Sequence, residues 1–495
     1  MQELTHPLHH GLGSYPVRRR ALAPQPIDFF SILLWCLLAV FAIQAALFAS
    51  VWGFAWVALG VVTLVARQRL KIPLIGVMET PIFLAMVSYS VSTLYLAGET
   101  QVFDLAHDAA LHRAMWLAWF GMACFVTGMI LALRFRPGRR LKDSVPLWMT
   151  EKEAILLFLT GMFFSEILAP FVPQSLFATC FIFGYCAPIG IFGFLALQTR
   201  LRPGWMSSWR FGAWILALAV WSVRSVLGGI FGSTILILFI FLLQYAHRSK
   251  AVLLGLLAVA VFLAPLMQET KNDYRTRISF DARGRERALR DILFDNFNRV
   301  ILHGDWNSYE KGIVQLAERL CAFDVWFSVK RHLDAQHDFA HGKTIVDALV
   351  TTFIPRIIWS SKPITGGSSE LATTYADMIV SEDTSVGVGN ISEFYINGGE
   401  WAVVFGMLAL GALGGAILRM GWSERVQPLG IILSIIAFSQ MMRPEANLSD
   451  VLGGLLRTLF LWAVLRIWLW RRHHHRIFRN PVLQKMRVFP DAKKS

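Results

Sequence analysis

The sequence predicts an all-α polytopic membrane protein with about twelve transmembrane helices and one large helical extracytoplasmic loop domain. The first observation is composition: 55% of the residues are hydrophobic and only 16% are charged, which excludes an ordinary soluble protein. The second is that apolar runs near the length needed to cross a bilayer recur along the chain. The third is one long polar segment, residues 268–399, between such runs.

The apolar runs divide the chain into two membrane parts. Residues 29–267 hold nine expected spans, at 29–48, 51–66, 78–97, 115–134, 153–172, 175–197, 211–228, 229–246 and 251–267. Residues 400–470 hold three more, at 400–419, 427–442 and 451–470. A polar tail (1–28) precedes them and a basic tail (471–495) follows. Because no small-residue cleavage site follows the first run, we expect a retained anchor and not a removed signal peptide.

The distribution of charge predicts the orientation. The connections expected on one side are all basic, at 67–71, 134–142, 200–210, 247–250, 419–425 and the tail from 471. The segment from Met267 to Gly399 instead has 15 Lys and Arg against 18 Asp and Glu. Positive loops stay in the cytoplasm, so both termini are expected there and the polar segment on the opposite side. The net charge of +14 therefore reports orientation and does not indicate nucleic-acid binding.

Within the polar segment we expect helices and no strands. Apolar residues at helical spacing predict one amphipathic helix from Asp305 to His337, and a second short helix from Gly342 to Ile354 that ends at Pro355. The glycines of VGVGN (386–390) have no strand-loop-helix context, so a nucleotide site is not favoured. Gly411 and Gly415 fit small-residue helix packing.

Three motifs then carry a resemblance. PRIIWSSKP (355–363), SEFYINGG (392–399) and the arginine-bearing WSVRS (221–225), with the long outer loop between late spans, resemble the Wzy-type O-antigen and exopolysaccharide repeat-unit polymerases of the O-antigen ligase and polymerase superfamily. The resemblance implies a GT-C-like, metal-independent glycosyltransferase that needs no cofactor. It would act at the outer side of the bacterial cytoplasmic (inner) membrane.

The implied reaction transfers a growing glycan from one polyprenyl pyrophosphate to the non-reducing-end sugar of an incoming polyprenyl-pyrophosphate-linked repeat unit. The implied partners are these two lipid-linked glycans, membrane lipids and a chain-length regulator protein, with no nucleic acid. A ligase of the same superfamily, and a lipid-linked oligosaccharide flippase, are the alternative functions. A flippase usually shows internal repeats around a midplane site, and the sequence shows no clear repeat.

Arginines are the expected phosphate ligands, because a guanidinium stays charged and binds phosphate oxygens through a planar fork. Arg224 lies inside an apolar run, Arg275 and Arg277 follow the ninth span, and Arg356 lies in the first motif. Lys362 and Arg319 are weaker candidates. The structural alternatives are a snorkelling or Glu166-paired Arg224, and ordinary lipid-phosphate contacts for Arg275 and Arg277.

The acceptor hydroxyl needs a general base, and Glu393 is the first choice. Its alternative role is a helix N-terminal charge that stabilises the macrodipole. Tyr395 and Asn397 are expected to bind sugar, and Arg443 and Glu445 to line the same cavity from a short outer loop. Weaker candidates for the base are Glu370, Asp377 and His341. The aromatic residues that could stack on sugars, or anchor at the interface, are Trp359, Tyr375 and Phe394.

Overall fold

The computed structural model of the protein describes residues 51–70, 78–91, 109–134, 150–168, 183–191, 209–227, 306–354, 368–378, 386–423, 428–441 and 443–479, with a few shorter pieces. Over these ranges the chain forms helices and loops and no strand. This confirms the prediction of an all-α protein.

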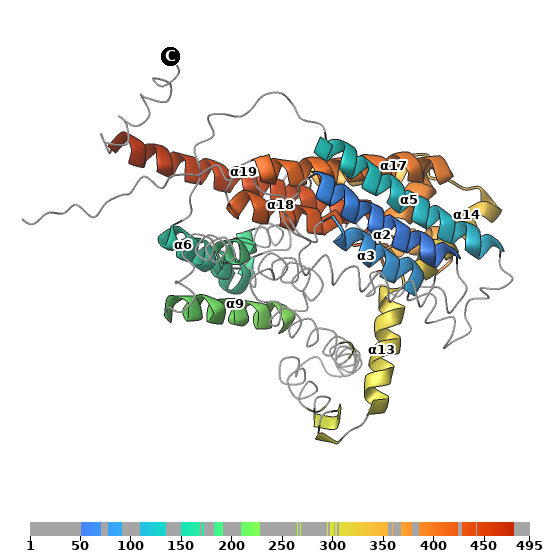
Figure 1. The fold of residues 1–495 in the computed structure, drawn as a ribbon, viewed down its shortest axis with the longest axis horizontal. Helices are drawn as coiled ribbons and strands as arrows, with labels where there is room; N and C mark the ends of the chain where they lie inside the picture. Colours follow the sequence, from blue (N-terminus) through green and yellow to red (C-terminus); the bar gives the residue numbers. More distant parts are fainter. Residues whose placement is uncertain are drawn as a thin grey trace, which may run out of the picture.

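The helices follow the chain in two groups that the polar segment separates (Figure 1). The first group is α2 (Val51–Leu70), α3 (Thr80–Met86) with the π-helix η1 (Val87–Val91), α5 (Ala109–Arg134), α6 (Glu151–Met162) with the π-helix η2 (Phe163–Leu168), and α9 (Trp209–Leu227). The polar segment contributes α13 (Trp306–Leu320), α14 (Phe323–Gln336), α15 (Lys343–Phe353) and α16 (Ser368–Ala376). The second group is α17 (Asn390–Ser423), α18 (Pro428–Met441) and α19 (Leu448–Arg479).

Among the described residues, three stretches are helical, long and apolar enough to cross a membrane: Ala109–Arg134, Asn390–Met420 and Leu448–Leu469. The spans expected at 51–66, 78–97, 153–172, 211–228 and 427–442 each contain a described helix, although these helices do not meet that criterion in full. The spans expected at 29–48, 229–246 and 251–267 lie outside the described residues, and 175–197 is described only over 183–191. The total of twelve spans stays a prediction.

Large apolar side chains cover much of the outside of these helices. Leu159, Leu216, Phe405 and Phe460 are each more than half exposed. A soluble protein rarely exposes such large apolar patches. This surface is the kind that lipid chains would cover.

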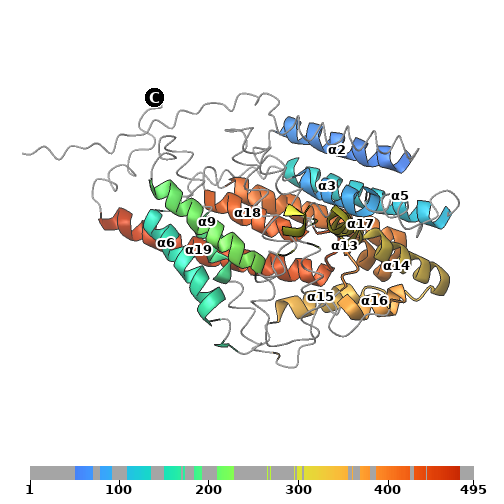
Figure 2. The ribbon, with the colours of Figure 1, turned by 90° about the horizontal axis from the view of Figure 1, so that it is seen from below.

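The central contact joins α5 and α17, which run parallel along their length (Figures 1 and 2). A Cβ on Gly411 would overlap the carbonyl oxygen of Phe125, and one on Gly128 would overlap the carbonyl oxygen of Leu408. A Cβ on Gly415 would lie 2.6 Å from the carbonyl oxygen of Met129. The predicted packing role of Gly411 and Gly415 is therefore confirmed, because only residues without side chains let the two backbones approach this closely.

A second apolar cluster lies beside the first. Side chains of α6, of residues 183–191 and of α9 pack against the middle of α18 and α19, with Trp214, Leu433 and Trp462 among the buried members. α18 also packs on α17, and the end of α18 and the first turns of α19 belong to the cluster around α5 and α17. These two helices therefore connect the two clusters.

The prediction of a single helix from Asp305 to His337 is wrong. The chain breaks at Cys321–Ala322 into α13 and α14, and α13 projects from the bundle in Figure 1. α14 turns to bury Phe323 and Trp326, and the Trp326 indole N–H donates to the Ala114 carbonyl at 2.9 Å. Burial of these aromatic rings on α5 favours the turn over one continuous helix. The short helix expected at 342–354 is confirmed as α15.

The expected start of the tenth span coincides with a kink inside α17. Gly398 and Gly399 have non-helical backbone angles, with Gly399 in the left-handed region at φ 63°. Residues 390–397, which we expected in the loop domain, form helical turns before this kink. The SEFYIN part of the motif is therefore helical, and its two glycines form the kink.

One end of the bundle collects the basic residues of the connections expected in the cytoplasm. Arg67 forms a buried ion pair with Glu79, and the Arg419 guanidinium donates to the Ala132 carbonyl at 3.3 Å. α6 begins there with a capping box, in which Thr150 and Glu153 each bond the other's backbone N–H. The buried Glu153 carboxylate also lies 3.8 Å from Arg472 of α19.

Candidate functional site

The glycine-rich stretch 386–390 packs directly on the short loop 443–447. A Cβ on Gly387 would lie 1.9 Å from the carbonyl oxygen of Glu445, and one on Gly389, at φ 83°, would lie 2.4 Å from the carbonyl oxygen of Pro444. The Val388 N–H donates to the Asn447 side-chain oxygen at 2.9 Å. These glycines therefore permit a close backbone approach. The approach brings two sequence-predicted groups, near Glu393 and near Arg443, to one place.

Glu393 lies in the first turn of α17 and is 1% exposed. Its Oε2 accepts a hydrogen bond from the Leu448 N–H at 2.6 Å, and its Oε1 accepts one from the Thr344 hydroxyl at 3.4 Å. Leu448 is the first residue of α19 and Thr344 lies in the first turn of α15. The carboxylate thus joins three helices, and the partial positive charge at the start of α19 stabilises it.

Asn397 lies one turn after Glu393 on the same face of α17. Its Nδ2 donates to the Thr344 hydroxyl and to the Glu393 carbonyl, both at 2.6 Å. Asn390, three residues before Glu393, shares this face because residues three and four apart are neighbours on a helix. We name Asn390, Glu393 and Asn397 the acidic face of α17.

Several buried polar atoms at this place have no hydrogen-bond partner within the described part of the chain. They are the side-chain oxygens of Asn390 and Asn397 and the side-chain nitrogen of Asn447. A buried polar group without a partner costs about 1–3 kcal/mol. A side-chain amide without a partner can accept a hydrogen bond from a hydroxyl group of a bound molecule, or donate one to it.

Tyr395 lies on the other side of the same turns. Its hydroxyl donates to the Asp334 carboxylate and accepts from the Lys330 ammonium at 3.3 Å, while Lys330 and Asp334 pair at 2.6 Å. The rings of Trp326 and Phe339 pack edge-on against it, with centroids 5.2 and 6.0 Å away. This paired network, which we name the anchored face of α17, fastens α14 to the helix. It separates Tyr395 from Glu393, beside which we expected it to act.

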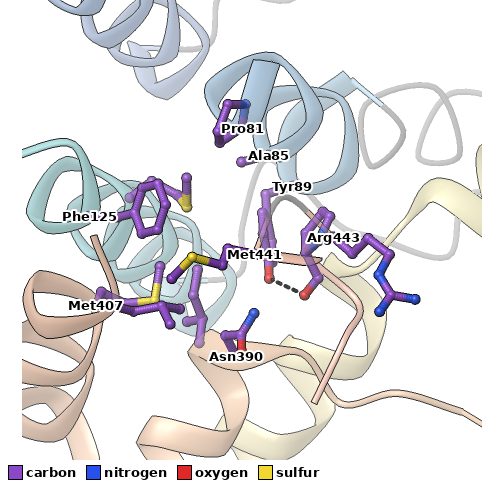
Figure 3. A pocket seen from close by; sticks show the side chains of 12 residues that line it. Pro81, Ala85, Tyr89, Phe125, Asn390, Met407, Met441 and Arg443 are labelled. Atoms are coloured by element: carbon purple, nitrogen blue, oxygen red, sulfur yellow. Dashed lines mark hydrogen bonds between the residues drawn. The ribbon is translucent and has the colours of Figure 1, made fainter. Parts of the chain in front are cut away.

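A narrow apolar pocket adjoins the acidic face (Figure 3). Asn390 points into it, and the Tyr89 hydroxyl donates to the Pro444 carbonyl at 3.5 Å beside it. The remaining lining is mostly apolar and comes from α3, α5, α17 and the end of α18: Pro81, Ala85, Met122, Phe125, Ile391, Met407, Leu410 and Met441. Its free volume of about 20 Å³ has room for about one water molecule.

Arg443 also lines the pocket, and its guanidinium points away from the apolar side chains in Figure 3. It donates to the Gln440 side-chain oxygen at 3.3 Å. Glu445, the other candidate of this loop, is exposed. Arg443 and Glu445 both lie in the loop 443–447, which packs on residues 386–390 just before Glu393.

The side chains of the remaining phosphate-binding candidates lie outside the described part of the chain. Arg275, Arg277, Arg356 and Lys362 lie outside the described residues. The backbones of Arg224 and Arg319 lie in α9 and α13, but their side chains are likewise outside the described set. Their roles stay predictions.

The weaker candidates for the base are exposed. His341 precedes α15, Glu370 begins α16, and Asp377 follows α16, where it pairs with the His332 ring at 2.8 Å. Among the aromatic candidates, Phe394 is buried against Gly406 and is not available for stacking on a sugar.

Trp359 and Tyr375 are partly buried, and burial raises the pKa of the Tyr375 hydroxyl above its ordinary value. Among the described residues, no group of three or more His, Cys, Asp or Glu could hold a metal ion.

Thr344, Asn390 and Asn447 were not singled out from the sequence. Asn447 lies four residues before the last expected span (451–470) and directly before α19, a position in which asparagine is a common helix N-cap. This pattern could have identified it. Thr344 carries no comparable pattern, because its contact with Glu393 joins residues far apart in the chain.

Comparison with known proteins gives one match. The profile of one family, a domain of unknown function (DUF8712), matches residues 74–424. No curated protein matches the chain, and no solved structure matches it.

Proposed function

The chain belongs to the family of the domain of unknown function DUF8712, and we propose that it is a lipid-linked glycan polymerase. It would be a metal-independent glycosyltransferase that moves a growing glycan from polyprenyl pyrophosphate to the non-reducing-end sugar of an incoming lipid-linked repeat unit. The resemblance of residues 221–225, 355–363 and 392–399 to Wzy-type polymerases motivates this proposal.

The observation that carries the proposal is the acidic face of α17. A buried carboxylate at Glu393 is held by two donors, beside amide groups of Asn390, Asn397 and Asn447 that have side-chain atoms without partners in the described part of the chain. Sugar hydroxyls are both donors and acceptors, so they satisfy such amides. A positioned carboxylate next to them is what abstraction of a hydroxyl proton needs.

In the proposed reaction, Glu393 takes the proton of the acceptor hydroxyl as its oxygen attacks the anomeric carbon of the donor glycan. The bond between that carbon and the phosphate oxygen breaks, and polyprenyl pyrophosphate leaves with the electron pair. Negative charge grows on the leaving group, so cationic side chains stabilise the transition state. We assign this role to Arg224, Arg275, Arg277 and Arg356 from the sequence, with Arg443 at the pocket.

The finer architecture belongs to the same proposal: about twelve spans, a GT-C-like loop domain at 268–399, and the acidic face at the outer side of a bacterial inner membrane. Two features support this sidedness. The basic residues Arg67, Arg419 and Arg472 occupy contacts at one end of the helices, and positive loops are retained in the cytoplasm. Glu393 and Leu448 meet where α17 and α19 begin, at the ends of these helices that lie away from those arginines.

The test is incubation of the purified protein with a polyprenyl-pyrophosphate-linked repeat unit, with the products separated by length. A ladder of products supports a polymerase. A single addition to a different lipid or to a protein means a ligase instead. In cells, Arg356→Lys should stop elongation while repeat units still reach the outer leaflet; repeat units trapped on the cytoplasmic side would favour a flippase.

A further inference from the structure

Arg457 is a charged residue inside a stretch that is long and apolar enough to cross a membrane, Leu448–Leu469 of α19. It is partly buried, and its Nε donates to the Gly453 carbonyl at 2.9 Å. A charged side chain at the centre of a bilayer costs at least about 2.5–3.5 kcal/mol, and such residues mark functional sites. The same reasoning identified Arg224 from the sequence but was not applied to Arg457.

Gln440 connects Arg457's helix to Arg443. Its side chain accepts from the Arg443 guanidinium at 3.3 Å and also hydrogen-bonds Tyr185. It packs over Gly454 of α19, where a Cβ would come within 2.6 Å of the Gln440 oxygen. The end of α18 is thereby held on α19, and Arg443 is held on the same side as Arg457.

Both guanidinium groups act on the same acid and the same phenol. Arg443 and Arg457 each interact electrostatically with Asp450 and with Tyr185. The Asp450 carboxylate attracts both guanidinium groups and balances one of their two positive charges. One positive charge remains, and the planar donor forks of both arginines suit phosphate oxygens.

We propose that Arg443 and Arg457 together bind the diphosphate of a lipid-linked substrate, an assignment that rests on the proposed function. Arg443 also lines the pocket of Figure 3, whose free volume of about 20 Å³ is that of about one water molecule. A hydrocarbon chain enters between Met122, Met407 and Met441 only if these flexible side chains move aside. Asn390 faces this pocket one turn before Glu393, which directs the attached sugar toward the acidic face.

The test is a binding measurement on the full chain in nanodiscs of phosphatidylcholine, with farnesyl diphosphate as the probe. Arg457→Gln and Arg443→Gln should each weaken binding about ten- to hundredfold, because each removes charge-assisted hydrogen bonds. Arg457→Lys, which keeps the charge but loses the fork, should weaken it less. Farnesol, which has no phosphate, should bind wild type and variants equally.

The matched control is Arg466→Gln, an exposed arginine further along α19, which should leave binding unchanged. Thermal unfolding of each variant shows whether it is folded. If Arg457→Gln is not folded, the test depends on Arg443→Gln, which changes a loop residue. Folded variants of both arginines that bind within about twofold of wild type would overturn the proposal. So would phosphatidylglycerol that displaces the probe at equal concentration, because the arginines would then hold ordinary lipid headgroups.

This test separates the diphosphate site from the proposed function. Glu393→Gln should bind the probe like wild type, because it leaves both arginines in place. If binding depends on the arginines but the wild type forms no product ladder, the diphosphate site stands and the polymerase assignment fails.

Discussion

The acidic face and the anchored face occupy the same turns of α17 but differ in how their polar groups are satisfied. On the anchored face, Tyr395, Asp334 and Lys330 all bond one another. On the acidic face, the side-chain oxygens of Asn390 and Asn397 have no partner among the described residues. Within the described part of the chain, the polar groups of the anchored face bond one another, and two side-chain oxygens of the acidic face have no partner.

The difference teaches which buried polar residues of this chain are structural. A fully paired buried network rigidifies a protein and specifies one arrangement of its helices. An unpaired buried amide lowers stability unless another molecule bonds it, so the amides of the acidic face are candidates for ligand contacts. Substitutions on the two faces should therefore separate loss of stability from loss of activity.

Glu393→Gln should have the largest effect on activity. Glutamine keeps an oxygen to accept from the Leu448 N–H and a group to meet Thr344, so the fold should remain, but it cannot take a proton. The rate of glycan elongation should fall about 10²- to 10⁴-fold, the usual contribution of a general base. Elongation assays with thermal unfolding as the control measure this, and a folded variant with the wild-type product ladder would contradict the assignment.

Gly411→Leu should have the largest effect on stability, because both faces depend on the contact between α5 and α17. The new side chain would collide with the backbone of Phe125, and overpacking of this kind costs about 1–3 kcal/mol or more. The midpoint of unfolding in detergent should fall.

The matched control is Gly212→Ala in α9, where an added Cβ meets nothing within 4 Å. That variant should be as stable as wild type or slightly more stable, because alanine favours helix by up to about 1 kcal/mol over glycine. Equal unfolding midpoints for Gly411→Leu and wild type would show that the two backbones are not in close contact.

Asn390→Ala should weaken substrate use without loss of stability. Its side-chain oxygen accepts no hydrogen bond from the described residues, so its removal breaks no internal contact there. Loss of one hydrogen bond to a sugar or phosphate should raise KM about tenfold. A lower unfolding midpoint with unchanged KM would reverse the roles that we give to the two faces.

Tyr395→Phe should have the smallest effect on activity and a measurable effect on stability. It removes a hydroxyl that bonds Asp334 and Lys330, at a cost of about 1 kcal/mol, while the ring contacts with Trp326 and Phe339 remain. Elongation should stay within about twofold of wild type. A large loss of elongation in a stable variant would place Tyr395 in the site, as the sequence first indicated.

Much of the fold follows from periodicity. Apolar runs predicted the positions of α5, α9, α17 and α19, because burial or lipid contact of an apolar face determines a helix locally. The break between α13 and α14 was not predicted, because it falls at Cys321 and Ala322, with no glycine or proline to mark it. Tertiary burial of Trp326 decides that turn.

The site was predicted less completely, for two different reasons. Glu393 and Asn397 were identified with Arg443, but their contacts with Thr344 and Leu448 join distant parts of the chain, which no local pattern reports. The separation of Tyr395 from Glu393 was predictable in principle, because residues two apart do not share a helix face. The sequence pattern places residues 390–399 in the loop domain, where the spacing of helix faces does not apply.

The most direct test of the difference between the two faces is photo-crosslinking. A polyprenyl-diphosphate repeat unit with a photoreactive group on its first sugar would be bound to the membrane-embedded protein, irradiated, and the modified peptides identified by mass spectrometry. Adducts should concentrate in residues 386–397 and 443–457. Adducts concentrated instead in 326–339, on the anchored face, or spread evenly along the exposed apolar helices, would contradict the account.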